Sequence, residues 1–557
     1  MAHYHISYTN PQSQFIQLRA DFEVDNSKST KICLPSWRPG RYEIQNFAKR
    51  IRGLKVTDQY GNLLKFAKSD LSVWTIDHQN ESKFTVHYEY YAALMDAGNT
   101  WLDPDQLYIN PINCLFYIEY QRELPCTLEL DIPADYEIAT GLENTHNVCQ
   151  APSFNTLVDS PLIASPSLRK INYEVDHKDY SIWIQGMMPR EDEELEKDFK
   201  RFTEKTLEIM GDLPCHEYHF LNQMLPYRHY HGVEHWNSTV ITIGPSEALA
   251  ERERYVDFLG VSCHELFHTW NVIRLRPKEM IPYDFQQPNL HTTGFITEGI
   301  TTYYGDLILA RSGVYSFNEY LKELNKLLER HFSNEGRKNY SVAESSYDLW
   351  LDGYEKGIPG RKVSIYNEGA LAALILDLKI RHKHNNQRSL DDVMRKMWQN
   401  YGSNMSGYSA EDYQKVAEVI YGGSLSDYFN DVLFGCSAFV SELSPLLGSF
   451  GLKLFPSYPE NSIEKNYGFK ISSDKIVIDI DPNSEAYKLI MLKDSVIEVK
   501  EIDAGIEIYL ERHGQKLDVM VPSSEVSYFE ILQAERDSTI DGQQLNNLRN
   551  WLENCIP

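Results

Sequence analysis

The segment VSCHELFHTW, residues 261–270, brings two histidines and a glutamate together. His264 and His268 are four positions apart, so on an α-helix their rings share one face and can bind a single ion. Zinc suits this pair, because a catalytic zinc takes three protein ligands and keeps one position for a water molecule whose pKa it lowers. Glu265 directly follows the first histidine and is placed to accept the proton of that water. The alternative is a helix whose two histidines are solvated or hydrogen-bonded in a core, so the segment alone does not decide the function.

A candidate third ligand, Glu298, lies thirty positions after His268. The segment TEGITTYYGDLILARSG, residues 297–313, predicts a helix in which Thr297 is the N-cap and Glu298 belongs to the first turn. Prolines between this helix and the histidine helix must turn the chain back, which would let the two helices pack antiparallel. Asp306, two turns beyond Glu298, could orient a ligand ring through a hydrogen bond, although an acidic helix residue is more often solvated.

Changes in periodicity along the chain indicate the elements that position these residues. Up to about residue 186, alternating polar and apolar residues with many aromatic and β-branched side chains predict an antiparallel β domain. Helical patterns follow at about 190–211, 251–273, 297–312, 316–332, 368–383, 389–400 and 409–420. Short strand signals return after about residue 445. We therefore expect a multi-domain α+β protein with an N-terminal β domain at 1–186, a catalytic domain at 187–330, a helical domain at 331–444 and a β domain at 445–557.

The net charge argues against one large class of partners. The 557 residues carry a formal net charge of −26, and no run of Lys and Arg offsets it locally, so nucleic acid is not an expected partner. The first residues, MAHYHISYTNPQSQF, lack the basic start and apolar run of a secretory signal, and no segment is apolar enough to cross a membrane. The eight cysteines are scattered, as is typical of buried free thiols. We expect a cytoplasmic protein that does not associate with membranes.

Five stretches of the chain resemble one family. They are WRPGRYEIQNFAKRI at 37–51, HGVEHWNST at 231–239, SCHELFHTWNVIRLRP at 262–277, TEGITTYYGDLILARSG at 297–313 and SIYNEGALAALILDLKIR at 364–381. In content and order they resemble the M61 family of zinc aminopeptidases, the glycyl aminopeptidase type, which are distant relatives of the M1 aminopeptidases. The resemblance implies a thermolysin-like α/β catalytic domain with a helical extension, and hydrolysis of the first peptide bond of peptides that have a free N-terminus. It favours small first residues such as Gly and Ala.

The resemblance also implies how the candidate residues act. One Zn²⁺ per chain is held by His264, His268 and Glu298, and Glu265 is the general base. Tyr366, in the YNEG segment, resembles the tyrosine that stabilises the tetrahedral oxyanion, and a phenol hydroxyl aimed at a developing negative charge is a suitable donor. Without the resemblance, Tyr366 is one of 36 tyrosines, and a packing role is the simpler interpretation.

The HGVEHWNST segment resembles the part of the family that lies beside the substrate. This implies that Glu234 binds the free α-amine of the peptide, with Gly232 and Val233 alongside the peptide. The family usually has two glycines before the apolar residue, whereas here His231 precedes Gly232. A backbone that approaches a peptide closely favours glycine, so the departure implies a reshaped first subsite.

The C-terminal unit resembles the PDZ domain that many of these proteins carry, with YGFKI at 467–471 in the place of the carboxylate-binding loop. Two alternatives to the aminopeptidase stay open. One is a zinc endopeptidase on the same core, which would have no use for an amine anchor. The other is a non-catalytic interaction protein whose PDZ-like domain binds partners, and the intact set of metal-ligand and base residues argues against it.

Overall fold

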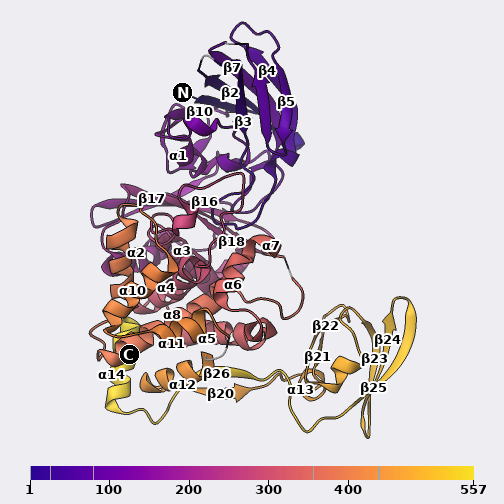
Figure 1. Ribbon diagram of the computed structural model, residues 1–557. Coiled ribbons are helices and arrows are strands. Elements are labelled where there is room, and N and C mark those ends of the chain that lie inside the picture. The colour runs from indigo at the N-terminus through magenta and orange to yellow at the C-terminus, as the bar shows by residue number, and fades with distance from the viewer. Residues whose placement is uncertain (1, 26, 80, 356, 437–438, 557) are drawn as a thin grey trace.

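The computed structural model describes residues 2–25, 27–79, 81–355, 357–436 and 439–556. Three parts are visible in Figure 1: a β-rich N-terminal part at one end, a larger body of strands and helices, and a small β module that projects beside the body. The expected multi-domain α+β class with an N-terminal β domain is therefore confirmed. No helix in the described ranges combines the length and the apolar character that crossing a membrane requires.

The N-terminal part is built on a seven-stranded sheet. Its strands, in spatial order, are β12 (Glu143–Thr145), β13 (Val148–Ala151), β10 (Cys126–Leu130), β1 (Ala2–Ser7), β2 (Phe15–Glu23), β7 (Lys83–Tyr91) and β4 (Ile51–Asp58). In β2, Ile16, Leu18, Ala20 and Phe22 are buried while the residues between them are more exposed, the pattern of a sheet with one face on a core. Two smaller sheets contain β3 (Ser29–Cys33), β6 (Val73–Asp77) and β5 (Lys65–Asp70), and β11 (Glu137–Thr140), β14 (Leu162–Ser165), β9 (Leu107–Ile109) and β8 (Trp101–Leu102).

A five-stranded sheet begins the body of the protein. Its strands, in spatial order, are β15 (Arg169–Val175), β16 (Lys178–Gln185), β17 (Glu217–Met224), β19 (Ser238–Gly244) and β18 (His229–Glu234). The structure therefore differs from the expected boundary at residue 186, because β16 pairs in parallel with β17, from Asp179↔Glu217 to Gln185↔Gln223. Local periodicity identifies a strand but not its partner, and here the partner follows the long helix α2 (Asp192–Met210).

The helices predicted from periodicity are present in the body. Besides α2, they are α3 (Arg252–Phe267), α4 (Thr301–Arg311), α5 (Phe317–Phe332), α8 (Ile365–Lys383), α9 (Leu390–Met397) and α10 (Ala410–Tyr421). A single cluster of buried apolar side chains runs from β15 through these helices to α14 (Gly542–Leu552). The structure thus shows one core where we expected separate units at 187–330 and 331–444.

The helix that carries Glu298 begins earlier than predicted. Thr297 is not its N-cap, because a π-helical turn at Phe295–Ile300 continues directly into α4. The side-chain amide of Asn271 donates to the carbonyl oxygens of Ile296 (2.8 Å) and Thr297 (3.3 Å). These two carbonyl oxygens thus accept hydrogen bonds from outside the helix at the π-helical turn. The donor comes from another segment, so the local sequence could not indicate it.

The C-terminal stretch 445–557 divides into two parts instead of forming one domain. Its outer segments, α12 (Phe439–Ser449), β20 (Leu452–Ser457), β26 (Ile531–Arg536) and α14, contribute to the core of the body. Asn325 of α5 exchanges two hydrogen bonds with the backbone of Ala534 in β26. The structure therefore departs from the expected C-terminal domain, because both of its ends pack on the helices of the body.

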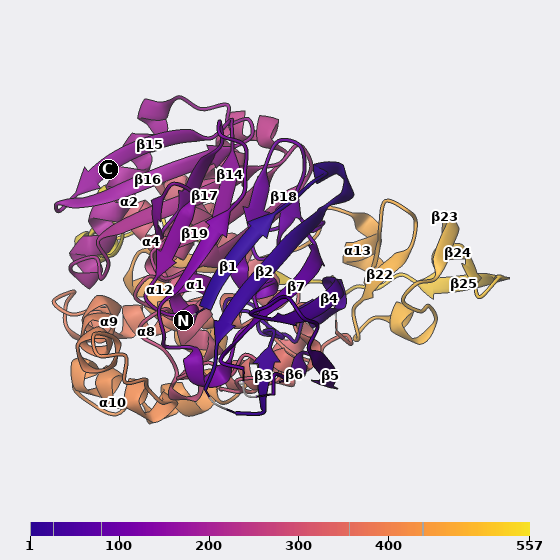
Figure 2. The same cartoon turned by 90° about the horizontal axis from the view of Figure 1, so that it is seen from above.

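Between β20 and β26 lies the C-terminal module, residues 462–522, which has a small core of its own. It contains α13 (Ser462–Tyr467), β21 (Phe469–Ile471), β22 (Val477–Ile480), β23 (Ser495–Ile502), β24 (Gly505–Arg512) and β25 (Gln515–Pro522). The module projects from the body in both Figure 1 and Figure 2, so it is an insertion between two paired strands. Its PDZ-like character stays a prediction.

Candidate active site

The two histidines of the HELFH segment and Glu298 converge on one point. His264 lies in the last turn of α3 and His268 is the C-cap residue of that helix, and their Nε2 atoms are 2.9 Å apart. The Oε2 atom of Glu298 lies 3.8 Å from His264 Nε2 and 3.4 Å from His268 Nε2. All three possible ligand atoms fall within 4.8 Å of one another. Two imidazole nitrogens and one carboxylate oxygen are a donor set that fits zinc.

Asn271, which sequence reasoning missed, links the elements that carry these ligands. Its backbone carbonyl accepts a hydrogen bond from Nδ1 of His268 at 2.7 Å, which leaves Nε2 of that ring free to bind a cation. Its side-chain amide reaches the π-helical turn that bears Glu298 and also donates to Thr301 Oγ1 at 3.0 Å. In the sequence, the only indication of this role is that Asn271 is a polar residue between the apolar residues Trp270 and Val272.

Two glycines bring α8, and with it Tyr366, to the ligand cluster. A Cβ atom added to Gly299 would lie 2.4 Å from the Cα atom of Gly369, so the π-helical turn and α8 meet backbone to backbone. Only glycines on both sides permit this approach. Tyr366 lies one turn before Gly369, and its ring stacks on His264 with the ring centroids 6.4 Å apart. The hydroxyl groups of Tyr366 and Tyr354 are 3.5 Å apart.

The carboxylate of Glu265 is buried against the strand β18. The Oε2 atom of Glu265 is buried and has no hydrogen-bond partner among the described residues. A Cβ atom added to Gly232, on the edge strand β18, would lie 2.3 Å from Glu265 Oε1. Glycine at position 232 therefore makes room for this carboxylate. Val233 is the next residue of the strand, and its buried side chain belongs to a different apolar cluster on the opposite face.

A further buried carboxylate, that of Glu234, lies beside Glu265. Glu234 is only 5% exposed. Ligand atoms of Glu234, Glu265 and His268 lie within 4.8 Å of one another. A loop of the N-terminal part covers Glu234, since a Cβ atom added to Gly40 would lie 2.6 Å from its Oε2 atom. The φ angle of Gly40 is +76°, which also favours glycine at this position. The structure thus brings the predicted amine anchor and the predicted base together.

Burial and charge shift the pKa values of the site in opposite directions. Burial raises the pKa of Glu265, and the carboxylates of Glu234 and Glu298 raise it further against the attraction of His268. Burial lowers the pKa of His264 to about 4. Burial acts in the same direction on His268, yet the carboxylates of Glu298 and Glu234 raise its pKa to about 10. A divalent cation among these three buried carboxyl groups and two imidazoles would favour the ionised form of the carboxyl groups and the neutral form of the imidazoles.

Tyr42 is a second residue that sequence reasoning missed. Its hydroxyl donates to Oε1 of Glu298 at 2.8 Å, so it occupies the carboxylate oxygen that faces away from the histidines. Tyr42 belongs to the WRPGRY segment, which by its sequence indicates only an ordered loop. The segment crosses from the N-terminal part and completes the surroundings of Glu298.

Asp306 does not orient a ligand ring in this structure. Among the described residues, no hydrogen bond joins it to either histidine, and the Nδ1 atom of His268 is already bound to Asn271. Burial raises the pKa of Asp306 to about 8, with a further contribution from Glu323. The ring of His268 is oriented instead by the backbone carbonyl of Asn271.

Comparisons with known proteins identify the family of this chain. Residues 3–166 match the peptidase M61 N-terminal domain, and residues 257–372 match the M61 glycyl aminopeptidase domain. The chain belongs to the M61 peptidase family and is a peptide hydrolase. No curated protein matches the chain.

The chain was also compared with solved structures. The crystal structure of an aminopeptidase N family protein from Idiomarina loihiensis has a TM-score of 0.90 at 24% identity, over 99% of this chain and 100% of that chain. An M1 zinc metallopeptidase from Deinococcus radiodurans, bound to a Tyr-Ser-Ala substrate, has a TM-score of 0.49 at 13% identity, over 78% of this chain and 94% of that chain. Yeast LTA4 hydrolase in complex with bestatin has a TM-score of 0.46 at 11% identity, over 77% of this chain and 66% of that chain. The first comparison shows that the fold is shared along the whole chain.

Proposed function

We propose that the protein is a zinc aminopeptidase that hydrolyses the first peptide bond of peptides with a free N-terminus. The observation that supports this most strongly is the buried carboxylate of Glu234 beside Glu265 and His268. A buried carboxylate needs a positive partner, and the protonated α-amine of a peptide supplies one. An endopeptidase on the same core would have no use for this group.

One zinc ion per chain would be held by His264, His268 and Glu298. The hydrogen bonds from His268 to Asn271 and from Tyr42 to Glu298 support this assignment, because such contacts orient metal ligands. When bound, zinc lowers the pKa of water and polarises a carbonyl group.

The chain's own residues divide the remaining work. Glu265 takes the proton of the attacking water and passes it to the leaving amine, which its buried and unpartnered Oε2 atom permits. Tyr366 donates a hydrogen bond to the oxygen that becomes negative in the transition state. An extended peptide can pair with the backbone of Gly232 and Val233, because β18 is an edge strand of its sheet.

Glu234 determines which bond is cut. A charge-assisted hydrogen bond to the α-amine fixes the distance between the first residue and the catalytic groups, so only the first peptide bond reaches them. The family resemblance favours Gly or Ala as the first residue. The resemblance also supports a PDZ-like fold for the C-terminal module, and a purely binding function is the second candidate for that module alone.

The zinc assignment predicts a distinct pattern of metal content. Wild-type protein should contain one zinc per chain by elemental analysis, and His268→Ala should lose it because one of three ligands is gone. Glu298→Gln should bind zinc more weakly, since the amide is a poorer ligand than the carboxylate. Glu265→Gln should keep its zinc. If Glu265→Gln lost zinc as completely as His268→Ala, the division between ligands and base would be wrong.

A further inference from the structure

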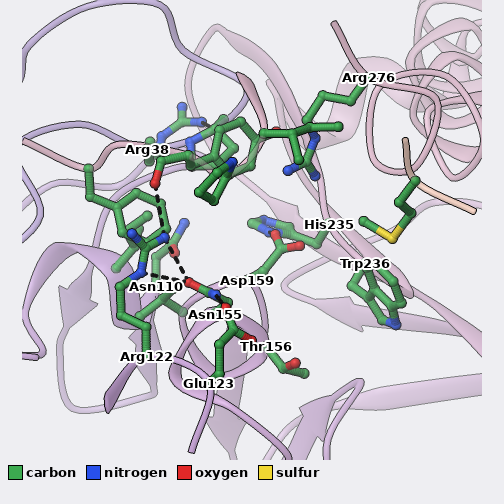
Figure 3. Close-up of a pocket in the computed structure, with 18 residues that line it drawn as sticks. Arg38, Asn110, Arg122, Glu123, Asn155, Thr156, Asp159, His235, Trp236 and Arg276 are labelled. Carbon is green, nitrogen blue, oxygen red and sulfur yellow. Dashed lines mark hydrogen bonds and ion pairs between the residues drawn. The ribbon is translucent and has the colours of Figure 1, made fainter. Parts of the chain in front are cut away.

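A cavity of about 280 Å³ lies between the N-terminal part and the body, outside the ligand cluster described above. Its walls come from α1 (Phe154–Val158) and neighbouring residues on one side and from residues 276–285 of the body on the other (Figure 3). Neither histidine of the HELFH segment lines it. The proposed function gives this cavity no role.

The cavity adjoins the amine anchor through two chain neighbours. His235, which follows Glu234, lines the cavity, and so does Pro39. Pro39 precedes Gly40, and a Cβ atom at that glycine would lie 2.6 Å from Glu234 Oε2. A molecule in the cavity would therefore sit directly behind the wall that holds Glu234.

Two buried side chains line the cavity with polar atoms that have no partner. His235 is 4% exposed, its Nδ1 atom lies 2.9 Å from Asp159 Oδ1, and its ring points into the cavity in Figure 3. Its Nε2 atom has no hydrogen-bond partner among the described residues. Asn110 is fully buried, and within the same ranges neither the oxygen nor the nitrogen of its amide is bonded. Unsatisfied buried polar atoms are unfavourable, so each of these atoms requires a ligand or a water molecule.

Three arginines line the cavity, Arg38, Arg122 and Arg276. Arg38 is 1% exposed, and its buried Nε atom has no hydrogen-bond partner among the described residues. Arg276 is 8% exposed, donates to two backbone carbonyl oxygens at 2.7 and 3.3 Å and stacks on Tyr283. Among the described residues it forms no ion pair with a carboxylate. Arg122 is 7% exposed, and its ion-pair partner, Glu119, lies outside the cavity lining. A buried guanidinium that forms no ion pair favours an anionic ligand.

The acidic groups of the cavity are already engaged. Asp159 faces His235, and Glu123 accepts a hydrogen bond from the Asn155 amide at 2.7 Å. The rest of the lining is largely apolar and includes Ile112, Val158, Phe285 and Met405. The volume is near the lower limit of about 300 Å³ for ligand pockets, so a small carboxylic acid with a short aliphatic chain fits.

We propose that this cavity binds a carboxylate carried on a short aliphatic chain. The carboxylate would accept hydrogen bonds from Arg276 and from the Asn110 amide. It can come from a free small-molecule acid or from an acidic side chain at the first position of a peptide. Only the second source rests on the proposed function.

The test is a calorimetric titration of the full chain with glutarate and with its neutral analogue glutaramide. Glutarate should saturate one site, and glutaramide should bind about ten-fold more weakly, because it cannot form charge-assisted hydrogen bonds. Arg276→Gln should weaken glutarate binding about ten-fold. Arg190→Gln is the matched control: Arg190 also donates to two backbone carbonyls and stacks on a tyrosine, Tyr255, but it does not line the cavity. The affinity of this control variant for glutarate should stay within about two-fold of that of the wild type.

A second arm distinguishes the two sources of the carboxylate. If the first side chain of a peptide enters the cavity, a glutamyl anilide should be hydrolysed about ten-fold faster than a glutaminyl anilide, and Arg276→Gln should remove the difference. If a free acid is the ligand, the two anilides should react equally while glutarate still binds. The titration does not depend on hydrolysis, so an inactive enzyme leaves the cavity proposal testable. The proposal would be overturned if glutarate and glutaramide bound equally, or if the two arginine variants lost glutarate affinity to the same extent. It would also be overturned if glutarate showed no saturable binding and the two anilides were hydrolysed at equal rates.

Discussion

Glu265→Gln is expected to lower kcat by about 10²–10⁴, the range typical of a lost general base, while zinc content stays at one per chain. Glutamine has nearly the same shape as glutamate, so it should fit the space that Gly232 leaves, but it cannot accept the proton of the attacking water. Steady-state hydrolysis of an alanyl anilide, with zinc determined on the same sample, measures both quantities.

The control for this variant is Glu253→Gln. Glu253 lies in the first turn of the same helix, is exposed and pairs with Lys322 on the surface. Its replacement should leave kcat within about two-fold of wild type, because exposed ion pairs contribute little. If Glu265→Gln were as active as Glu253→Gln, another group would have to be the base.

Tyr366→Phe is expected to lower kcat by about 10²–10³ with little change in KM, as removal of one oxyanion donor does. The substitution removes a hydroxyl and keeps the ring that stacks on His264, so the ligand cluster should be preserved. The measurement is the separate determination of kcat and KM for one substrate.

Tyr354→Phe is the informative comparison, because the two hydroxyl groups are 3.5 Å apart and either could face the substrate. Tyr354 is 41% exposed, whereas Tyr366 is partly buried beside the ligands. We expect the smaller loss for Tyr354→Phe. A larger loss there than in Tyr366→Phe would assign the oxyanion contact to Tyr354.

The sequence predicted those features of the site that depend on local spacing. His264, His268 and Glu265 lie within two turns of one helix, so their relative placement follows from helical geometry. The predicted helices are present for the same reason. Glu298 could be selected by residue type, but its surroundings include Asn271, whose amide donates to the π-helical turn from another segment.

Features that depend on distant pairing could not be predicted. Tyr42 reaches Glu298 from a loop of the N-terminal part, and no periodicity connects the two segments. The parallel pairing of β16 with β17 moves two strands out of the expected N-terminal domain, because a strand pattern does not specify its partner. The contact of Gly299 with Gly369 likewise could not be predicted, because it depends on how the π-helical turn packs against α8.

In the proposed function, Glu234 binds a free α-amine and thereby limits cleavage to the first peptide bond. The most direct test compares one alanyl peptide in free and N-acetylated form, with the products identified by mass spectrometry. We predict that the free peptide loses only its first residue and that the acetylated peptide is not cleaved, because a capped nitrogen carries no charge for Glu234 to bind. Rapid cleavage of the acetylated peptide, or cleavage at internal bonds of either form, would contradict this account and favour an endopeptidase.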